Sequence, residues 1–461
     1  MKKLYALLAV LGLVFVLAAC GGSDDKDNKG NKDKDNGNNA GDKEEVTISY
    51  AHWNLGTEED MNLERLMLKQ FQEDYPHINV ELYEISGNWN EQLAAAASAG
   101  NMPDVFAVPD LPLALSNDWV LDVTYMTAED EDFKKVPQIV RQSTEHEGKV
   151  VALPFAQHFL GYFVNKDLFN SANLDFPTMD STVEEFEASV KAVTNVNGGV
   201  VGLQNAGSIT DWYPAAANPD LGWYTYNDGK YQLDSNEFIA GVKFANEVVT
   251  NGYAYDNLTD DQKANFSGEN ASEVWYNGGI GIWWDGTWAN STFAENASFE
   301  YDFIGIPGGK TAITNDLLGL SKTTAHPEEA YLFAKYMSYG KEGFMKRMEI
   351  AAKEGKVVNT LPINSDQEIL DEYFAQLNIP GIRKAYDRLD EAILEPVKTV
   401  PGYAQSRWNA PTGVKTAESE NASVAQLINS FVTGELKVED YATQLNKLAN
   451  DKYAEAVEAL K

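Results

Sequence analysis

The chain has a single cysteine, Cys20, among its 461 residues. One thiol can form no internal disulfide and supplies no cysteine-based zinc cluster. Histidine is also scarce: the five histidines are scattered, and no two of them stand three or four residues apart. A helical His-x-x-x-His metal site is therefore excluded, and we expect neither a bound metal nor a cofactor.

Basic residues are few. Lys and Arg together number 36 against 70 Asp and Glu, which gives a net charge of −34 at pH 7. A field of this sign repels phosphate backbones and anionic lipid, so it excludes nucleic acid as a partner. A hydrophobic content of 44%, with 10 Trp, 22 Tyr and 20 Phe, excludes an unfolded polymer. The length predicts two to three ordinary domains or two large lobes.

Motifs of common enzyme classes are missing. No Gly-rich phosphate loop follows a predicted strand, and no Gly-x-Ser-x-Gly elbow is present. Residues 256–268 hold several Asp and Asn but lack the residue order of an EF-hand loop. A calcium site elsewhere in the chain stays open as an alternative. With 70 acidic residues, no particular carboxylate pair stands out as a general acid and base.

An apolar run covers residues 4–19, directly after Lys2 and Lys3. It is shorter than the roughly 20 residues of a membrane-spanning helix and fits a secretory signal. Its end, Leu17-Ala18-Ala19-Cys20-Gly21, resembles the lipobox of bacterial lipoproteins, whose cysteine takes a diacylglycerol thioether. We therefore predict a signal peptide at residues 1–19, lipidation of Cys20 and a place on the extracellular face of the bacterial cell membrane. A plain secretory signal with an incidental cysteine and a retained span are the alternatives.

Residues 20–44 are predicted to be a disordered tether. After Cys20, their only apolar residue is Ala40, so burial cannot offset the entropy of the chain. Such a coil spans about 25–30 Å. Its seven acids and five lysines leave −2, which the +2 of the signal cancels, so the whole net charge belongs to the body after residue 44.

The first part of the body alternates predicted strands and helices. Strands are expected at residues 46–53, 79–85 and 103–109, with a helix capped at Thr57 that ends near Pro76 and a second helix over residues 88–100. This order implies a parallel sheet, in which ligands bind beyond the carboxyl ends of the strands. The residues at or near those ends are Trp53, Asn54, Asn88, Trp89 and Asp110.

Two extended runs meet at Leu153-Pro154 within residues 148–169, which is the pattern expected of a strand that passes between lobes. Residues 303–308 are predicted to form a second crossing. A strand at 318 and a helix starting at Pro327 follow. The tail over residues 422–461 is predicted to be helical and split near Gly434.

Five tryptophans stand beside turn signals or polar neighbours rather than in the middle of predicted helices: Trp53, Trp89, Trp212, Trp288 and Trp408. An indole can stack on the C–H face of a pyranose while nearby polar groups take its hydroxyls, which predicts a carbohydrate site. Ordinary packing is the alternative for each ring. We assign Trp119 and Trp275 to packing. At least one of Trp283 and Trp284 is expected in the core, because neighbouring strand residues face opposite ways.

Three segments carry a family resemblance: residues 153–169, the turn Asp285-Gly286-Thr287-Trp288-Ala289, and residues 318–334. They resemble the extracellular solute-binding proteins, the maltose-binding-protein-like sugar receptors of ABC importers, from about residue 46 to the end. The resemblance implies an α/β, two-lobed periplasmic-binding-protein-like fold of class II type. Each lobe would be a mainly parallel sheet flanked by helices, and hinge crossings would join the lobes. The N-terminal lobe would comprise residues 45–152 and 308–372, and the C-terminal lobe residues 156–304 and 376–461.

The same resemblance implies stacking aromatics at Trp288 and Trp408, with a third in Asp211-Trp212-Tyr213. The complete set of predicted ligand-binding residues is Trp53, Asn54, Asn88, Trp89, Asp110, Gln157, His158, Asp211, Trp212, Tyr213, Asp285, Trp288, Arg407 and Trp408. His158 stands where some maltose receptors carry an acid, and Asp285 replaces a common Asn, so maltodextrin is not assumed. Asn54, Asn88 and Asp110 have turn or cap formation as their alternative.

These patterns predict a lipid-anchored, monomeric receptor that captures a mono- or oligosaccharide between two lobes and delivers it to the permease of an ABC importer. It would break no bond, and it would meet the membrane only through its lipid. A surface glycoside hydrolase with a carboxylate pair and a non-transport glycan-binding module are the alternatives. Amine, polyol and peptide ligands are the alternatives to a sugar.

Overall fold

The computed structural model describes residues 44–59 and 61–461. The predicted signal peptide, the lipidation site Cys20 and the tether up to residue 43 lie outside the described residues, so those predictions stay untested. No helix in the described part has both the length and the apolar character needed to cross a membrane.

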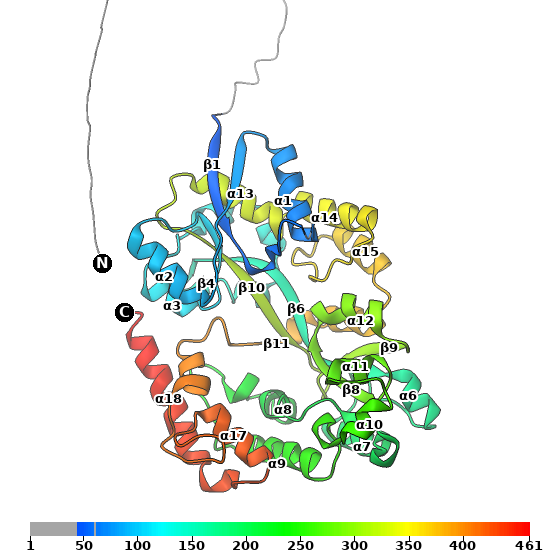
Figure 1. Ribbon diagram of the computed structural model, residues 1–461. Helices are drawn as coiled ribbons and strands as arrows, with labels where there is room; N and C mark the ends of the chain where they lie inside the picture. Colours follow the sequence, from blue (N-terminus) through cyan, green and yellow to red (C-terminus); the bar gives the residue numbers. More distant parts are fainter. Residues whose placement is uncertain (1–43, 60) are drawn as a thin grey trace, which may run out of the picture. The chain divides into compact units, whose positions relative to one another are not determined.

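A mixed sheet runs through the described chain in the order β2-β1-β3-β10-β6-β8-β7 (Figure 1). β11 pairs with β10, and β9 pairs with β6. β4 and β5 form a separate hairpin. The strands are β1 (Val46–Ala51), β2 (Ile78–Leu82), β3 (Val105–Ala107), β4 (Glu145–His146), β5 (Lys149–Val150), β6 (Leu153–Asn165), β7 (Val201–Leu203), β8 (Ile280–Gly286), β9 (Tyr301–Gly305), β10 (Ala312–Leu320) and β11 (Ile393–Leu394).

Helices cover the sheet at both of its ends, which gives the predicted two-lobed α/β fold. They are α1 (Leu63–Asp74), α2 (Trp89–Ala99), α3 (Leu111–Ser116), α4 (Thr124–Glu129), α5 (Gln138–Arg141), α6 (Lys166–Ser171), α7 (Val183–Val193), α8 (Ile209–Ala217), α9 (Asn236–Thr250), α10 (Asp260–Ala264), α11 (Ala271–Tyr276), α12 (Asn290–Asn296), α13 (Pro327–Met337), α14 (Lys341–Glu354), α15 (Gln367–Gln376), α16 (Pro380–Tyr386), α17 (Val424–Val432) and α18 (Ala442–Glu458).

The parallel arrangement expected for the first strands is confirmed. β1 pairs in parallel with β2, from Val46 opposite Ile78 onward, and in parallel with β3, with Tyr50 opposite Val105. In the second lobe β7 pairs in parallel with β8. The carboxyl ends of β1, β2 and β3 therefore meet at one edge, where ligands of open α/β sheets bind.

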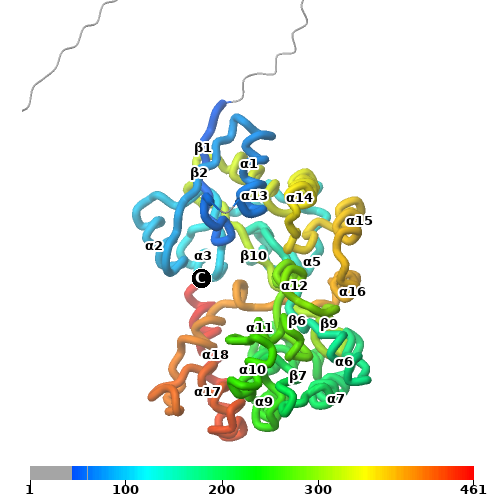
Figure 2. The backbone as a smooth tube through the Cα atoms, turned by 45° about the vertical axis from the view of Figure 1, so that its right-hand side comes forward, coloured from blue at the N-terminus to red at the C-terminus, as the bar shows by residue number. Residues whose placement is uncertain are grey.

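Two long antiparallel strands, β6 and β10, pass from one lobe to the other (Figure 1). β6 is buried along nearly all of its length, because it is covered on both faces. After α16 the chain returns through the same region, as the orange segment of Figure 2 shows, and there β11 pairs with β10. The prediction of a crossing at the start of β6 is confirmed.

The second crossing was predicted in the wrong segment. Strand β9 ends at Gly305 and pairs with the second-lobe half of β6, and the chain then turns through Gly308 and Gly309, both at positive φ. The crossing strand is β10. Gly305 also has a positive φ and lies against Gly161 of β6, so the turn needs glycine there.

Several helices begin and end at the residues that their capping signals predicted. Asn88 caps α2 and Gly100 ends it in the left-handed conformation, and α13 begins at Pro327. The helix predicted to be capped at Thr57 begins instead after Asn62, whose side-chain oxygen accepts a hydrogen bond from the Arg65 N–H at 3.0 Å. The C-terminal helices α17 and α18 flank Gly434 as predicted.

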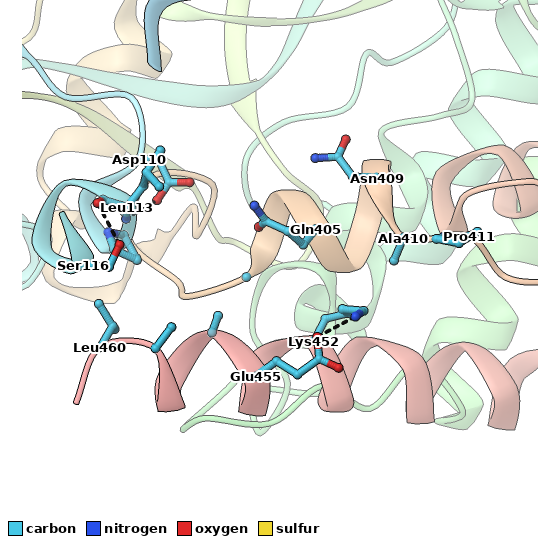
Figure 3. Close-up of a pocket in the computed structure, with 14 residues that line it drawn as sticks. Asp110, Leu113, Ser116, Gln405, Asn409, Ala410, Pro411, Lys452, Glu455 and Leu460 are labelled. Carbon is cyan, nitrogen blue, oxygen red and sulfur yellow. Dashed lines mark hydrogen bonds and ion pairs between the residues drawn. The ribbon is translucent and has the colours of Figure 1, made fainter. Parts of the chain in front are cut away.

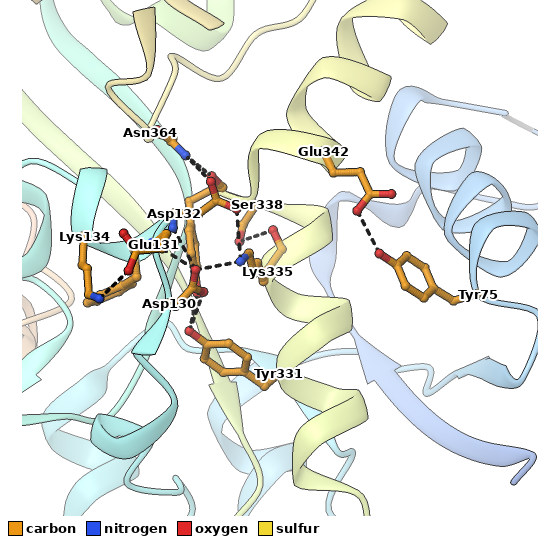
Figure 4. A network of polar contacts seen from close by, with 12 residues as sticks. Tyr75, Asp130, Glu131, Asp132, Lys134, Tyr331, Lys335, Ser338, Glu342 and Asn364 are labelled. Carbon is orange, nitrogen blue, oxygen red and sulfur yellow. Dashed lines mark hydrogen bonds and ion pairs between the residues drawn. The ribbon is translucent and has the colours of Figure 1, made fainter. Parts of the chain in front are cut away.

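A buried polar network fixes α13 in the first lobe (Figure 4). The Asp130 carboxylate accepts hydrogen bonds from Tyr331 Oη at 2.8 Å, Lys335 Nζ at 2.6 Å and Tyr339 Oη at 3.2 Å. Burial alone would raise the pKa of Asp130, but the bonds from Lys335 and Tyr331 outweigh it and hold that pKa below its ordinary value. The network joins the loop after α4 to the helix behind β10.

Candidate functional site

Three of the ten tryptophans are exposed, and the sequence had singled out all three as ligand-binding candidates. Trp53, Trp288 and Trp408 are 38%, 43% and 45% exposed. Trp119, Trp212, Trp223, Trp275 and Trp283 are buried, and Trp89 and Trp284 are half-buried. The exposed rings are therefore free to contact a ligand, whereas the buried rings pack in the core.

On the first lobe, Trp53 follows β1 in the short helix Trp53–Leu55 and contacts Trp89 at the start of α2. The two rings meet edge to face, with centroids 5.3 Å apart. The indole N–H of Trp89 donates a hydrogen bond to the carbonyl oxygen of Ala107 in β3, at 2.9 Å. The loops after β1 and β2 are thus tied to β3, and two of the residues predicted near the carboxyl ends of these strands, Trp53 and Trp89, are in contact.

The polar first-lobe candidates Asn88 and Asp110 cap helices. Asn88 Oδ1 accepts from the Glu91 N–H at 3.2 Å, and Asp110 Oδ1 accepts from the Leu113 N–H at 2.9 Å. Burial raises the pKa of Asp110 above its ordinary value. The cap function expected as the alternative is therefore present at both positions, and it leaves Asp110 Oδ2 outside the capping bond.

A cavity of about 290 Å³ brings Asn54, His158 and Trp288 together. Its other lining residues are Asn62, Leu63, Glu64, Phe155, Ala156, Arg347, Val357, Asn359 and Thr360. The rings of His158 and Trp288 meet edge to face at 5.2 Å. Because His158 sits on β6 and Trp288 follows β8, the antiparallel pairing of these two strands sets this contact.

His158 is a neutral imidazole at pH 7. Burial lowers its pKa to about 4, despite the nearby Asp316 carboxylate. Its Nδ1 atom is buried and has no hydrogen-bond partner among the described residues. A neutral imidazole can donate through one nitrogen and accept through the other, which suits an uncharged hydroxylated ligand better than a carboxylate would.

Gln157 and Asp285 lie near this cavity but do not line it. The Gln157 side chain is buried, and its backbone N–H donates to Thr360 Oγ1 at 3.1 Å. Asp285 accepts from Trp283 Nε1 at 3.2 Å and from the Gly286 N–H at 2.8 Å, so it stabilises the turn that carries Trp288. Burial raises the pKa of Asp285.

Trp408 rests on a buried ion pair. Arg407 lies 2.6 Å from Asp211 of α8 and donates to Tyr403 Oη at 2.6 Å. Its guanidinium stands 4.4 Å from the Tyr224 ring centroid and 5.4 Å from that of Trp408. Both charged groups are therefore occupied within the protein, and they hold the short helix Gln405–Asn409 that presents Trp408.

Trp212 requires a correction. It lies inside helix α8, is fully buried, and donates its indole N–H to Tyr162 Oη at 2.9 Å. The ring packs against Tyr162 and Phe186 and has no free face for a ligand. Tyr213 is half-buried, contacts Phe244 and faces a different groove, beside Asp180. The structure therefore brings neither aromatic ring to Trp288 or Trp408.

A second cavity, of about 470 Å³, involves residues that the sequence did not suggest (Figure 3). It lies between α3, the helix Gln405–Asn409 and α18. Its polar lining consists of Asp110, Ser116, Gln405, Asn409, Lys452 and Glu455. Only Asp110 was predicted. The remaining residues carry no local motif, and those on α3 and on α18 are more than 300 positions apart in the chain.

Arg347 and Glu64 are also new. The Arg347 guanidinium binds both Glu64 oxygens, one of them at 2.9 Å, and also the Met337 carbonyl oxygen at 2.8 Å. This pair forms one wall of the smaller cavity. In the described residues no group of three or more His, Cys, Asp or Glu side chains is arranged to hold a metal ion.

Residues 56–338 match the family described as bacterial extracellular solute-binding protein. A binding protein of Brucella abortus (strain 2308) is 23% identical over 269 residues, which cover 56% of this chain and 60% of that protein. An ABC transporter extracellular-binding protein of Pyrococcus horikoshii is 25% identical over 56% of this chain and 59% of its own length. The match thus spans about three fifths of the length of these curated relatives.

Solved structures share the fold. An ABC substrate-binding protein of Listeria monocytogenes in complex with cycloalternan superposes with a TM-score of 0.67 at 21% identity, covering 89% of this chain and 99% of that one. The sugar-binding protein MalE of Xanthomonas citri gives 0.66 at 15% identity, covering 89% and 98%. The family match over more than half of the chain, together with this fold, shows that the chain belongs to the bacterial extracellular solute-binding proteins.

Proposed function

We propose that the protein is the substrate-binding lipoprotein of an ABC importer, and that it captures a mono- or oligosaccharide between its lobes and delivers it to a membrane permease. The observation that carries this proposal is the cavity in which the exposed ring of Trp288 meets Asn54, which follows β1, and His158 of β6. Indole faces with neutral hydrogen-bonding groups suit a pyranose.

The likeness to receptors described with sugars supports this ligand class. The Listeria protein was solved with cycloalternan, a Thermotoga lettingae solute-binding protein with α-D-tagatose, and a cyclo/maltodextrin-binding protein with maltotetraose. The ligands of these three proteins differ from one another. The particular sugar therefore has to come from experiment.

Capture would follow a population shift. The lobes, residues 45–152 with 308–372 and residues 156–304 with 376–461, would close about the crossings β6, β10 and β11. A sugar that contacts both lobes has more contacts in the closed state, so it shifts the population toward closure. The closed, monomeric receptor would then dock on the permease. Cys20 would tether it to the outer face of the membrane through lipid.

A thermal-shift screen of the soluble body, residues 44–461, tests the proposal. The panel contains maltotetraose, cycloalternan, D-tagatose, xylo-oligosaccharides, a polyol, a polyamine and a tripeptide. A ligand that binds only the native state raises the unfolding midpoint. We expect a sugar to do so. A rise with the polyamine or the tripeptide alone would overturn the ligand class, and steady release of reducing ends would overturn the receptor function. The mass of the membrane-extracted protein tests the lipid on Cys20 separately.

A further inference from the structure

The three segments that pass between the lobes place one side chain each at the same register. Thr314 of β10 stands opposite His158 of β6. On its other side β10 pairs in parallel with β11, where Ile313 stands opposite Leu394, so Glu395 comes next to Thr314. The Glu395 N–H donates to the Ile313 carbonyl oxygen at 2.8 Å. We call His158, Thr314 and Glu395 the hinge row.

Glu395 is the acid of the hinge row, and it is poorly satisfied as an anion. The residue is only 9% exposed. Oε1 accepts from the Val397 N–H at 3.2 Å, and Oε2 accepts from the Thr314 hydroxyl at 3.4 Å, which is a long hydrogen bond. A buried carboxylate normally requires a cation or several short donors. Glu395 has neither.

Lys398, three residues along the chain, is committed elsewhere. Its ammonium lies 3.0 Å from Asp316 and donates to Thr314 Oγ1 at 3.3 Å. Its carbonyl oxygen accepts from the Leu111 N–H of α3 at 2.9 Å, which holds this crossing segment to the first lobe. The cation that faces Glu395 from its own segment is therefore neutralised by Asp316.

The groups that face Glu395 from the other elements also balance one another. From the second lobe these are Asp211 and Arg407, which pair at 2.6 Å, and the phenol of Tyr403, whose pKa burial raises well above its ordinary value. From β6 the row presents the neutral imidazole of His158. Because each charge is matched nearby, desolvation dominates and raises the pKa of Glu395 to about 7.

We propose that Glu395 is a proton-binding site of the hinge, and that closure of the lobes on a sugar is accompanied by uptake of one proton at this carboxyl. The coupling of proton uptake to closure on a sugar rests on the proposed function. Closure brings ligand over the floor of the junction and excludes water from it, which disfavours the anion further. The proton comes from the buffer and binds one carboxylate oxygen. The resulting O–H can donate to Thr314 Oγ1.

The sign of the pH dependence follows from this uptake. Below about pH 6 Glu395 is protonated with or without ligand, so the affinity for the sugar does not change with pH. Above pH 7 the free protein carries the anion and must bind a proton on closure, so affinity falls as pH rises. A full proton gives a tenfold fall per pH unit, which is the upper limit of the effect.

Two measurements test the two halves separately. The first needs no ligand: unfolding by urea is followed from pH 4.5 to 8.5 for wild type, Glu395→Gln and the exposed neighbour control Glu391→Gln. A carboxyl whose folded pKa is raised destabilises the fold progressively as pH rises from its unfolded pKa to its folded pKa. Glu395→Gln should therefore gain stability relative to wild type over this window, while Glu391→Gln should follow wild type.

The second measurement is calorimetric titration of the protein with a sugar at pH 7.5, carried out once in phosphate and once in Tris. The sugar is maltotetraose, unless another sugar of the panel gives a larger melting shift. These buffers differ widely in ionisation enthalpy, so proton uptake appears as a difference in heat. We expect wild type and Glu391→Gln to show it, and Glu395→Gln to bind without it. Equal heats in both buffers for wild type would overturn the coupling, and an unchanged pH profile of unfolding in Glu395→Gln would overturn the proton site.

A second variant keeps the proton site testable even if Glu395→Gln does not fold. Thr314→Val removes the hydroxyl that donates to Oε2 and should move the titration of Glu395 to higher pH. If no panel sugar binds wild type, the proposed function fails while the urea measurement still decides on the proton site. If the titration of Glu395 in Thr314→Val has the same midpoint pH as in wild type, the proposed interaction between Thr314 and Glu395 is wrong.

Discussion

Replacing Trp288 by alanine should weaken sugar binding about 10- to 100-fold without unfolding the protein. Trp288 is 43% exposed. With about 250 Å² for a whole tryptophan, this leaves about 110 Å² that a bound ring can cover. At about 25 cal/mol per Å² the covered indole contributes at most about 2.7 kcal/mol, close to a 100-fold change in Kd. Coverage of half of that area gives about 1.4 kcal/mol, which is about tenfold in Kd.

The measurement is calorimetric titration of Trp288→Ala and Trp408→Ala with the sugar selected by the thermal screen. Tyr125→Ala is the matched control, because Tyr125 of α4 is 60% exposed but lies outside both cavities. The control should keep wild-type affinity, and all three variants should stay folded without ligand. The two tryptophan variants should melt at a lower temperature than wild type, because more than half of each indole is buried. Wild-type affinity in both tryptophan variants would refute the assignment of the site.

Three further substitutions test the framework of the site. Asp130→Asn should cost about 1–3 kcal/mol of unfolding free energy at pH 7, because it weakens the charge-assisted hydrogen bonds from Lys335 and Tyr331, while Asp132 still pairs with Lys335 at 3.1 Å. Since the folded pKa of Asp130 is lowered, this stabilisation is present above the unfolded pKa of about 4 and is lost as pH falls from there through the folded pKa, so the difference in urea stability between wild type and variant should shrink over that range. Arg407→Met should destabilise by about 3–5 kcal/mol because it leaves Asp211 buried without its cation, and adding Asp211→Asn should recover part of the loss; strict additivity would contradict the pairing. Gly161→Ala would place a Cβ 2.6 Å from the Gly305 carbonyl oxygen and should cost about 1–3 kcal/mol, whereas Gly207→Ala, whose Cβ would have Asn205 Oδ1 at 3.7 Å as its nearest neighbour, should cost less.

The order of the first-lobe elements could be predicted because its signals are local. Alternating apolar residues, Asn88 at the start of α2, Gly100 at its end and Pro327 at the start of α13 act within a few residues of themselves. The start of α1 was misplaced because Thr57 and Asn62 both fit a cap, and the turn at Gly56 that separates them from β1 decides between the two.

The site could be predicted only in outline. Trp53, Trp288 and Trp408 have polar neighbours that were visible in the sequence, and their rings are exposed, but their role as ligand-binding residues stays a prediction. Trp212 has similar neighbours, yet it is buried because Tyr162, 50 positions away, accepts its indole N–H. The ion pair of Arg407 with Asp211 and the cavity between α3 and α18 join segments that no local pattern relates.

The sequence by itself determined the family, the alternation of strands and helices, and which tryptophans could face a ligand, because these depend on residue type and short-range spacing. Only the tertiary structure decided which rings are exposed, which carboxylates are already occupied, and that His158, Thr314 and Glu395 share one register across three crossings. The physical reason is that burial and pairing depend on contacts between segments up to hundreds of residues apart, and the same side chain is a ligand, a cap or a proton site according to those contacts.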